Sequence, residues 1–307
     1  MVCMNQRKIN PQRIEVQQRA MERQPAVAGL FYPRSKAEIK AMLDHFFNYV
    51  NLDKEFAKYK NELKQKFSNS KRGKINGIIV PHAGWIYSGL TAAYAYDLLK
   101  EYKFKKFILI GPNHTAYLNN AAIDENNFWQ TPLGRIKVLN YEKNHENKSS
   151  DVHKLFDDKL FILSSIPHEQ EHDLEVQAPF LQYLFNGSIE ILPIIIGDLD
   201  LKQLEKASDR LLNLYDDDTL FIISTDLSHY QQQQQANRLD KNTIEVINSL
   251  SFDRFEEIDA CGKNPLLIAM FLCKKLKTRP LMLKYTTSGD ITKDYSKGVV
   301  GYVSMVF

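Results

Sequence analysis

Short apolar runs alternate with segments of helical periodicity along most of the chain, and this alternation allows only a few folds. Residues 75–80 form a β-branched run, residues 88–101 have helical spacing, and residues 106–110 form a second apolar run. Ser88 is a candidate N-cap of the helix. Strand, helix and strand together span about the 30 residues of a βαβ unit. We therefore expect parallel strands that are connected by helices.

The same alternation continues to the C-terminus. Strands are predicted at residues 189–196, 219–223, 280–286 and 298–306, and helices at residues 201–214, 236–250 and 265–276. Pro193 indicates an edge position or a bulge for its strand, because proline cannot donate a ladder hydrogen bond. Fully apolar strands interleaved with helices predict a sheet covered on both faces. The expected fold is α/β, a three-layer α/β/α sandwich with a mostly parallel central sheet.

Composition excludes several classes of protein. A chain of 307 residues can bury roughly 75% of its unfolded surface, so folding requires neither a disulfide nor a metal. The net charge of +3 is too small to indicate a nucleic-acid surface. No run approaches the ~18 apolar residues of a membrane span. Three cysteines without a secretory signal indicate a reducing compartment, which predicts a cytoplasmic protein.

The domain organisation is expected to be simple. Residues 1–24 are polar and basic and lack the apolar core of a secretory signal, so we interpret them as an N-terminal extension whose order the sequence leaves open. An Arg-rich transit peptide is the alternative for this stretch, which its glutamates disfavour. Residues 25–307 are expected to form one α/β domain. Residues 141–150 are interpreted as a surface loop, and residues 231–235 as an exposed turn or the start of a helix.

Three histidines directly follow three predicted strands. His82 follows the run ending at Val80, His114 follows the second run, and His229 follows the strand at residues 219–223. Ligands of open α/β sheets bind at the carboxyl ends of the strands, and parallel neighbours lie ~5 Å apart. A lone histidine in a loop is usually just solvated. Because the placement recurs three times, the sequence predicts one shared functional site.

Several chemistries are compatible with such a site. Neutral imidazole suits iron, zinc, copper and nickel. Two histidines and a carboxylate leave open positions on Fe²⁺, and the same ligands on zinc would activate water. Without a metal, His229 hydrogen-bonded to Asp226 or Ser228 could act as an acid–base group. The sequence has no Gly-rich phosphate loop, GxSxG elbow or HExxH helix, which disfavours common hydrolase and nucleotide-binding classes.

The segment EQEHDLEVQ at residues 169–177 precedes a helix predicted to continue through Leu184. Asp173 is a candidate cap of that helix. Glu175 and Gln177 face either the crevice or solvent, and the sequence leaves both open. The remaining histidines, interpreted as structural, are His45, His145, His153 and His168. Cys273 lies in the run LLIAMFLC and is interpreted as a small buried hydrophobic residue.

Several motifs, in the same order along the chain, resemble the Memo family. They are AVAGLFYP near residue 30, VPHAGWIYSG, ILIGPNHT, EHDLEVQAPFLQ, LPIIIGD, STDLSHY and YTTSGD–VVGYVSM. The resemblance covers roughly residues 25–307. It implies a fold similar to the class III extradiol dioxygenases, in which two histidines and a glutamate hold non-haem Fe²⁺ and a further histidine transfers protons.

The resemblance also implies a role for particular residues. His82 and His114 match the metal-ligand histidines, His229 matches the acid–base histidine, and Cys261 in DACGKNP matches the third ligand position. From composition alone, Cys261 would be a half-buried small residue before a helix. A thiolate is softer than a carboxylate, so it favours copper or zinc and puts ring cleavage in doubt. Asp226 or Glu171 is the alternative carboxylate ligand.

The expected function is that of a non-haem metal protein, with iron as the first expectation and copper or zinc as alternatives. If the protein is an enzyme, we expect a metal-dependent oxidoreductase with His229 and Asp226 as catalytic residues. The candidate substrate-binding residues, with the first two at the mouth, are Trp85, Tyr87, Glu171, His172 and Gln177. The alternatives are a zinc-dependent hydrolase and a non-catalytic module that binds a peptide in the same crevice. By the resemblance, AMMECR-type and radical-SAM proteins are expected partners.

Overall fold

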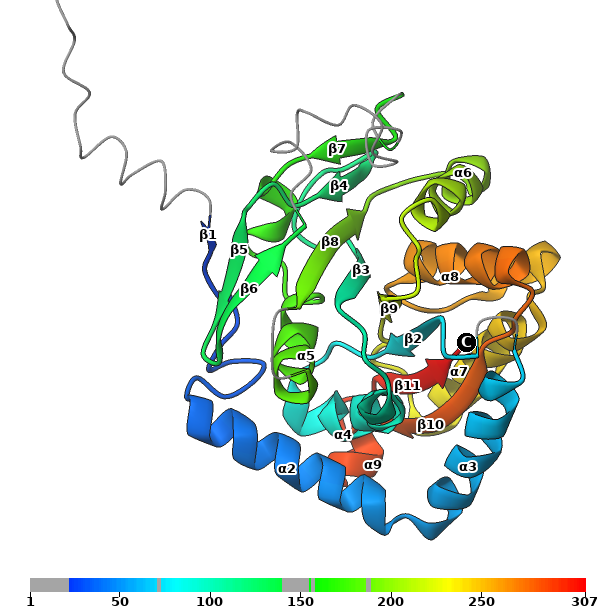
Figure 1. Ribbon diagram of the computed structural model, residues 1–307. Helices are drawn as coiled ribbons and strands as arrows, with labels where there is room; N and C mark the ends of the chain where they lie inside the picture. Colours follow the sequence, from blue (N-terminus) through cyan, green and yellow to red (C-terminus); the bar gives the residue numbers. More distant parts are fainter. Residues whose placement is uncertain (1–21, 71–72, 140–154, 156–157, 186–188) are drawn as a thin grey trace, which may run out of the picture.

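The computed structural model describes residues 22–70, 73–139, 155, 158–185 and 189–307. Within these residues, eleven strands form one sheet (Figure 1). The strands are β1 (Glu22–Arg23), β2 (Gly77–Val80), β3 (Lys106–Pro112), β4 (Ala121–Ile123), β5 (Phe128–Thr131), β6 (Gly134–Val138), β7 (Phe161–Leu163), β8 (Glu190–Ile196), β9 (Thr219–Ser224), β10 (Leu281–Thr287) and β11 (Gly301–Val306). The helices are α2 (Lys36–Leu52), α3 (Lys54–Ser68), α4 (Trp85–Leu98), α5 (Ala178–Leu184), α6 (Leu201–Leu212), α7 (Gln233–Ser249), α8 (Lys263–Leu276) and α9 (Ser288–Thr292).

The centre of the sheet is parallel, as predicted. Strands β8, β3, β9 and β2 are adjacent in that order and all pair in parallel. Strands β11 and β10 extend the sheet beyond β2 by antiparallel pairing. The three strands that precede the predicted site histidines are therefore direct neighbours.

Side chains of the central strands alternate between two apolar cores. Ile78 and Val80 belong to the core formed with α2, α3, α4 and α5. Ile79 belongs to the core formed with α6, α7 and α8. Successive strand residues point to opposite faces, so a strand that is apolar throughout is buried on both sides. Figure 1 shows α6 and α8 on one side of the central strands and α2, α4 and α5 on the other, which confirms the three-layer sandwich.

Strand β8 is interior and its register with β3 is unbroken, so the prediction that Pro193 marks an edge or a bulge is wrong. Pro193 pairs in register with Leu109 of β3. On its other side β8 pairs first with β6, at Glu190 and Ile191, and then with β4, from Ile194 onwards. Pro193 lies where the neighbour changes, which is why its missing N–H is tolerated there.

Two predicted helix caps are also corrected. Helix α4 begins at Trp85 after Gly84, and the Ser88 hydroxyl donates to the carbonyl of Ala83 from inside the first turn. The segment after Asp173 begins with a short 3-10 helix, and α5 starts only at Ala178 without a side-chain cap. Asp173 accepts a hydrogen bond from the adjacent Leu174 N–H and is fully buried. Ser88 and Asp173 are both buried, and a local cap motif does not reveal burial.

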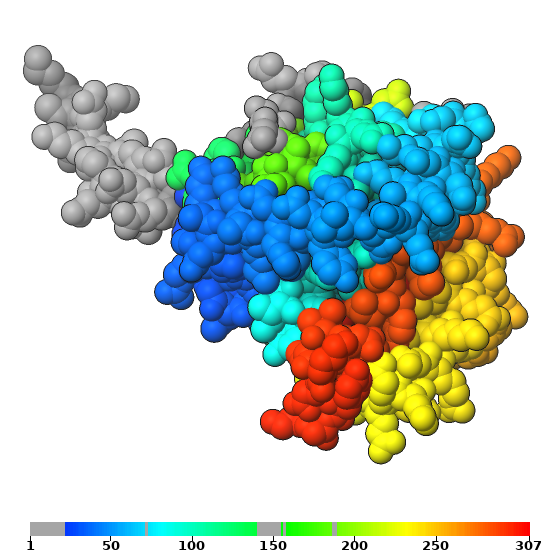
Figure 2. Space-filling model, turned by 90° about the horizontal axis from the view of Figure 1, so that it is seen from below, coloured from blue at the N-terminus to red at the C-terminus, as the bar shows by residue number. Residues whose placement is uncertain are grey.

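The N-terminal part contributes more to the fold than predicted. Arg23, placed in the extension at residues 1–24, pairs with Trp129 in the sheet and therefore belongs to the α/β domain. Helices α2 and α3 form a blue band across the face seen in Figure 2.

Helix α7 begins at Gln233, in agreement with one of the two interpretations of residues 231–235. The loop predicted at residues 141–150 lies outside the described residues. Among the helices of the described residues, none combines the length and apolar character needed to span a membrane.

Candidate metal centre

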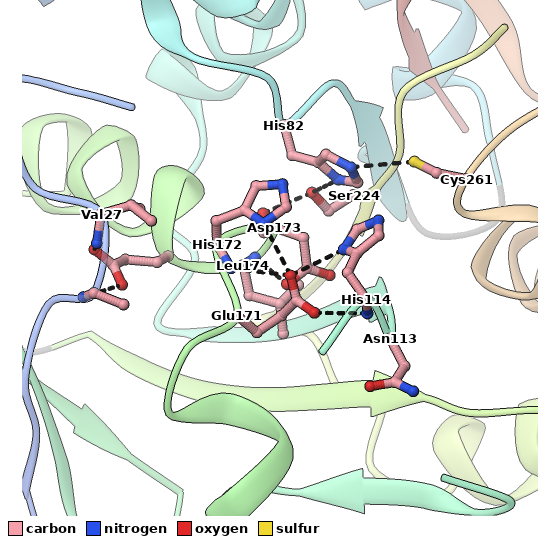
Figure 3. Close-up of polar contacts among 12 residues, drawn as sticks. Val27, His82, Asn113, His114, Glu171, His172, Asp173, Leu174, Ser224 and Cys261 are labelled. Carbon is pink, nitrogen blue, oxygen red and sulfur yellow. Dashed lines mark hydrogen bonds and ion pairs between the residues drawn. The ribbon is translucent and has the colours of Figure 1, made fainter. Parts of the chain in front are cut away.

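The carboxyl ends of β2 and β3 bring two of the predicted histidines, His82 and His114, together. Val80 of β2 pairs with Ser224 of β9, and β9 also pairs with β3, so the loops after all three strands open at one edge. The ring centroids of His82 and His114 are 5.3 Å apart. The ring of His172 lies 5.3 Å from His82 and 5.0 Å from His114, which adds a third imidazole (Figure 3).

Cys261 completes a set of metal-ligating atoms. The Sγ atom of Cys261 lies 3.1 Å from Nε2 of His82, and one donor atom each from His82, His114 and Cys261 lie within 4.8 Å of one another. A tetrahedral ion with bonds of ~2.1 Å to nitrogen and ~2.3 Å to sulfur places such donors about 3.6 Å apart. The His82–Cys261 pair would therefore have to open by about 0.5 Å, which side-chain rotation can supply. These residues fit a transition-metal ion.

The tautomer of His82 is fixed by Ser224. The Ser224 hydroxyl donates to the carbonyl of Asp173 at 2.8 Å, so its proton is already used. The hydroxyl oxygen lies 3.2 Å from Nδ1 of His82 and must accept there, which places the proton on Nδ1 and leaves Nε2 with a free lone pair. Gln177 donates its amide to Ser224 and to the carbonyl of Pro81, and so holds the hydroxyl in place.

Glu171 fixes the other two imidazoles in the same way. Its Oε1 atom lies 2.9 Å from Nδ1 of His114 and 3.0 Å from Nδ1 of His172. Its Oε2 atom accepts from the His114 N–H at 2.8 Å. Burial alone would raise the pKa of Glu171, but the hydrogen bonds from His114 and His172 outweigh burial and hold this pKa well below its usual range. An ionised carboxylate that accepts from Nδ1–H leaves the Nε2 atoms free, and Figure 3 shows the second ring nitrogen of His114 on the side of Cys261.

His114, Glu171 and His172 also form a second group of potential ligands. The distances between their atoms are hydrogen-bond lengths, and Glu171 is already occupied by N–H donors. Glu171 therefore supports the histidines from behind rather than providing the carboxylate ligand that the sequence left open.

The protonation states suit metal ligation. Burial, together with the neighbouring His172 and His114, lowers the pKa of His82 well below its ordinary value, so this imidazole is neutral. Burial and the nearby Asp226 raise the pKa of the Cys261 thiol far above its ordinary value. The thiol therefore carries a proton in the metal-free site, and a bound cation would replace that proton.

Asp226 and His229 follow β9, the middle strand of the three, and their hydrogen-bond partners differ from those considered in the sequence. Burial raises the pKa of Asp226 to about 6, and its Oδ1 atom accepts from the main-chain N–H groups of His82 and Ala83. The Nδ1 atom of His229 lies 2.7 Å from the carbonyl of Leu227, which can only accept, so His229 bonds to neither Asp226 nor Ser228. Its Nε2 atom is consequently the basic one, as a proton-transfer group requires.

Most of the other residues that were considered for the crevice are buried in the interior of the protein. Trp85 is only 2% exposed and donates to the carbonyl of Val176, so it does not line the mouth; Tyr87 remains partly exposed. Gln177 is buried; its amide nitrogen donates to Ser224 and to the carbonyl of Pro81, and its amide oxygen accepts from the Tyr96 hydroxyl. Glu175 faces neither the crevice nor solvent, because it is buried against Arg23.

Within the described residues, His45, His168 and Cys273 are in neither group of potential metal ligands. His45 is exposed on α2, and His168 is buried with Nε2 near the carbonyl of Ala122. Cys273 is fully buried, as predicted. Three of the residues considered in the sequence, Cys3, His145 and His153, lie outside the described residues.

Comparison with known proteins gives a consistent result. The family model for Memo-like proteins matches residues 23–306, a span that includes every residue of the candidate centre. A MEMO1 family protein from Thermoplasma acidophilum is 32% identical over 292 residues, covering 93% of this chain and 98% of the relative. MEMO1 family proteins from Methanopyrus kandleri and Nitrosopumilus maritimus are each 32% identical over 300 residues, covering 94% of this chain and 99% and 100% of the relatives.

Proposed function

The chain belongs to the Memo family, and we propose that it is a metal-dependent redox protein whose single ion is held by His82, His114 and Cys261. The observation that carries the proposal is the combination of a nearby thiol with two imidazoles whose Nδ1 protons are fixed by Ser224 and Glu171. Such outer hydrogen bonds orient metal-binding histidines and raise their basicity. They have no comparable use at a site that binds only a peptide.

Fe²⁺ is the ion we propose first, with copper or zinc as the alternatives that a thiolate ligand allows. When bound, the ion would supply an electron-transfer centre that can activate a small molecule such as dioxygen. His229, with its basic Nε2 atom, takes or gives a proton at the substrate. Asp226 holds the main chain of His82 and thereby keeps that ligand in position. Because the third ligand is a thiolate, we expect no ring cleavage of catechols.

Metal content tests the proposal. Protein purified without air, or reconstituted with Fe²⁺, should contain about one metal ion per chain by elemental analysis. His82→Ala and Cys261→Ser should each reduce the content at least tenfold, because each removes one of only three protein ligands. His45→Ala and Cys273→Ala are matched controls that remove the same residue types elsewhere and should retain the metal.

Three outcomes would change the conclusion. Absence of metal in the reconstituted wild type would rule out both the redox protein and the zinc hydrolase, and would leave the peptide-binding module. Full metal content in Cys261→Ser would show that the thiolate is not a ligand. Zinc as the bound ion, together with hydrolytic turnover, would favour the hydrolase.

The fixed tautomer of His82 gives a second prediction. Ser224→Ala removes the oxygen that accepts from Nδ1, so the proton can move to Nε2 and compete with the metal. We expect metal affinity about 10- to 100-fold weaker than in the wild type, measured by competition with a chromogenic chelator. Ser304→Ala removes another buried hydroxyl, one without a partner among the described residues, and should leave affinity unchanged. Equal affinity in Ser224→Ala and wild type would contradict the role given to Ser224.

A further inference from the structure

Arg23 lies in the short edge strand β1, and its side chain is buried against the segment that carries Glu171. The residue is 4% exposed. Its Nε atom donates to the carbonyl of His168 at 2.7 Å, and one terminal nitrogen donates to the carbonyl of Glu171 at 2.6 Å. The other terminal nitrogen donates to the carboxylate of Glu175 at 2.7 Å. One rigid guanidinium therefore holds three points of a segment that lies about 150 positions away in the sequence.

Two of these points are the ends of a single turn. The N–H of Glu171 lies 3.4 Å from the carbonyl of His168, which is a long hydrogen bond for a turn that must hold its shape. Arg23 binds both carbonyls from outside. Its planar fork can bridge them because guanidinium donors have fixed directions. The turn is thus braced by Arg23 more than by its own backbone.

The guanidinium is itself held in place. The Glu175 carboxylate balances its charge, and the ring of Trp129 lies 4.4 Å from its central carbon. A buried charge that leaves its partners is costly, so Arg23 cannot rotate away without a large penalty. The guanidinium is therefore rigidly held, and it fixes the position of the Glu171 main chain through the hydrogen bond to that carbonyl.

We propose that Arg23 is a positioning residue for the metal centre, acting through the main chain of Glu171 to aim the carboxylate that holds His114 and His172. This inference rests on the proposed function for its effect on metal affinity. The chain of contacts is short: Arg23 binds the Glu171 carbonyl, and the carboxylate of the same residue meets both imidazoles at Nδ1. Supporting partners of this kind typically change metal affinity by about 10- to 100-fold.

A purely structural role for Arg23 would affect stability alone, so the test compares variants of similar stability. The variants are Arg23→Ala, Arg23→Lys and, as control, Leu211→Ala. Leu211 is fully buried in α6, in the apolar core on the opposite face of the sheet from Leu174 and Val176. Its truncation therefore lowers stability by leaving a cavity in the other core. Lysine keeps the charge of Arg23 but offers one nitrogen in place of the three that bind the two carbonyls and Glu175, and it keeps the variant foldable if alanine does not.

Two readouts separate this proposal from the proposed function. The first is titration with Co²⁺, whose thiolate charge-transfer band reports coordination by Cys261. The second is the imidazole ¹⁵N NMR spectrum of the metal-free protein, which reports the tautomers of His114 and His172. We expect Arg23→Ala to bind Co²⁺ at least tenfold more weakly and to mix both tautomers, Arg23→Lys to be intermediate, and Leu211→Ala to match the wild type in both.

The outcomes are distinct. Wild-type affinity and a single Nδ1–H tautomer in the arginine variants, with a lowered Tm, would overturn the proposal and leave Arg23 a structural residue. If the wild type itself does not bind Co²⁺, the proposed function fails, and the tautomers of the metal-free variants still decide the role of Arg23.

Discussion

A Glu175→Ala variant is expected to lose at least about 5 kcal/mol of unfolding free energy. The carboxylate is buried and accepts from Arg23, from the main-chain N–H groups of Ala26 and Val27, and from the Tyr32 hydroxyl, all at 2.7–3.0 Å. Breaking a buried ion pair from one side costs about 3–5 kcal/mol, and each orphaned buried donor costs about 1–3 kcal/mol more. Alanine removes both acceptor oxygens and leaves all four donor groups without this partner.

Thermal unfolding followed by circular dichroism measures this effect. At roughly 2 °C per kcal/mol for a domain of this size, the Tm should fall by about 10 °C or more. Glu175→Gln keeps one acceptor oxygen and the side-chain shape, so its loss should be smaller. Glu245→Ala is the control, since it breaks only an exposed pair with Arg254 that contributes little. A Glu175→Ala protein that melts within about 2 °C of the wild type would show that water replaces the carboxylate in this cluster.

The strand ends and their histidines could be predicted because the signals are local. A short β-branched run followed by glycine or proline and a histidine is visible within ten residues at His82 and at His114. The parallel direction of β2, β3 and β9 then follows from the alternation with helices, whereas their order in the sheet does not. The sequence was sufficient to expect one shared site.

The supporting hydrogen bonds could not be predicted, because they join segments far apart in the chain. Arg23 and Glu175 are 152 positions apart, and His82 and Ser224 are 142 positions apart. Arginine, glutamate and serine are mostly exposed in proteins, so a single sequence gives no sign that these are buried. Ser224 left a faint signal, since it is a hydroxyl that directly follows four apolar residues of the same strand.

Two further differences from the prediction, the position of Trp85 and the presence of α2, do not arise from contacts between distant segments alone. Trp85 lies next to a site histidine in the sequence, but α4 begins at Trp85 and turns the indole into the core against Phe180. Helix α2 was not predicted, although Ile39, Leu43 and Phe46 have helical spacing and Ser35 accepts from the Glu38 N–H as its N-cap. In the first case tertiary packing overrode proximity in sequence. For α2, the helical periodicity in the sequence was enough to predict the helix.

Gly111→Ala is expected to destabilise the protein by about 3 kcal/mol and to weaken the metal centre at the same time. Gly111 lies in β3, outside the left-handed backbone region, so alanine introduces no backbone strain there. A Cβ atom at this position would lie 1.7 Å from Oδ2 of Asp173 and 2.8 Å from Leu174 Cδ2. Asp173 directly follows Glu171 and His172, so a displaced carboxyl would shift the groups that orient His114.

The double variant Gly111→Ala/Asp173→Ala identifies the cause of that loss. Oδ2 of Asp173 has no partner among the described residues, and burial raises the pKa of this carboxyl well above its ordinary value. Asp173→Ala alone leaves the buried Leu174 N–H without its acceptor, which costs about 1–3 kcal/mol, but it also removes the closest obstacle to the new methyl group. Measured by Tm and by Co²⁺ affinity, the double variant should be little worse than Asp173→Ala alone, with a coupling energy above about 1 kcal/mol. Simple addition of the two single effects would mean that Gly111 is required for the strand itself, whereas strong coupling would show that this glycine exists to admit the Asp173 carboxyl beneath the metal centre.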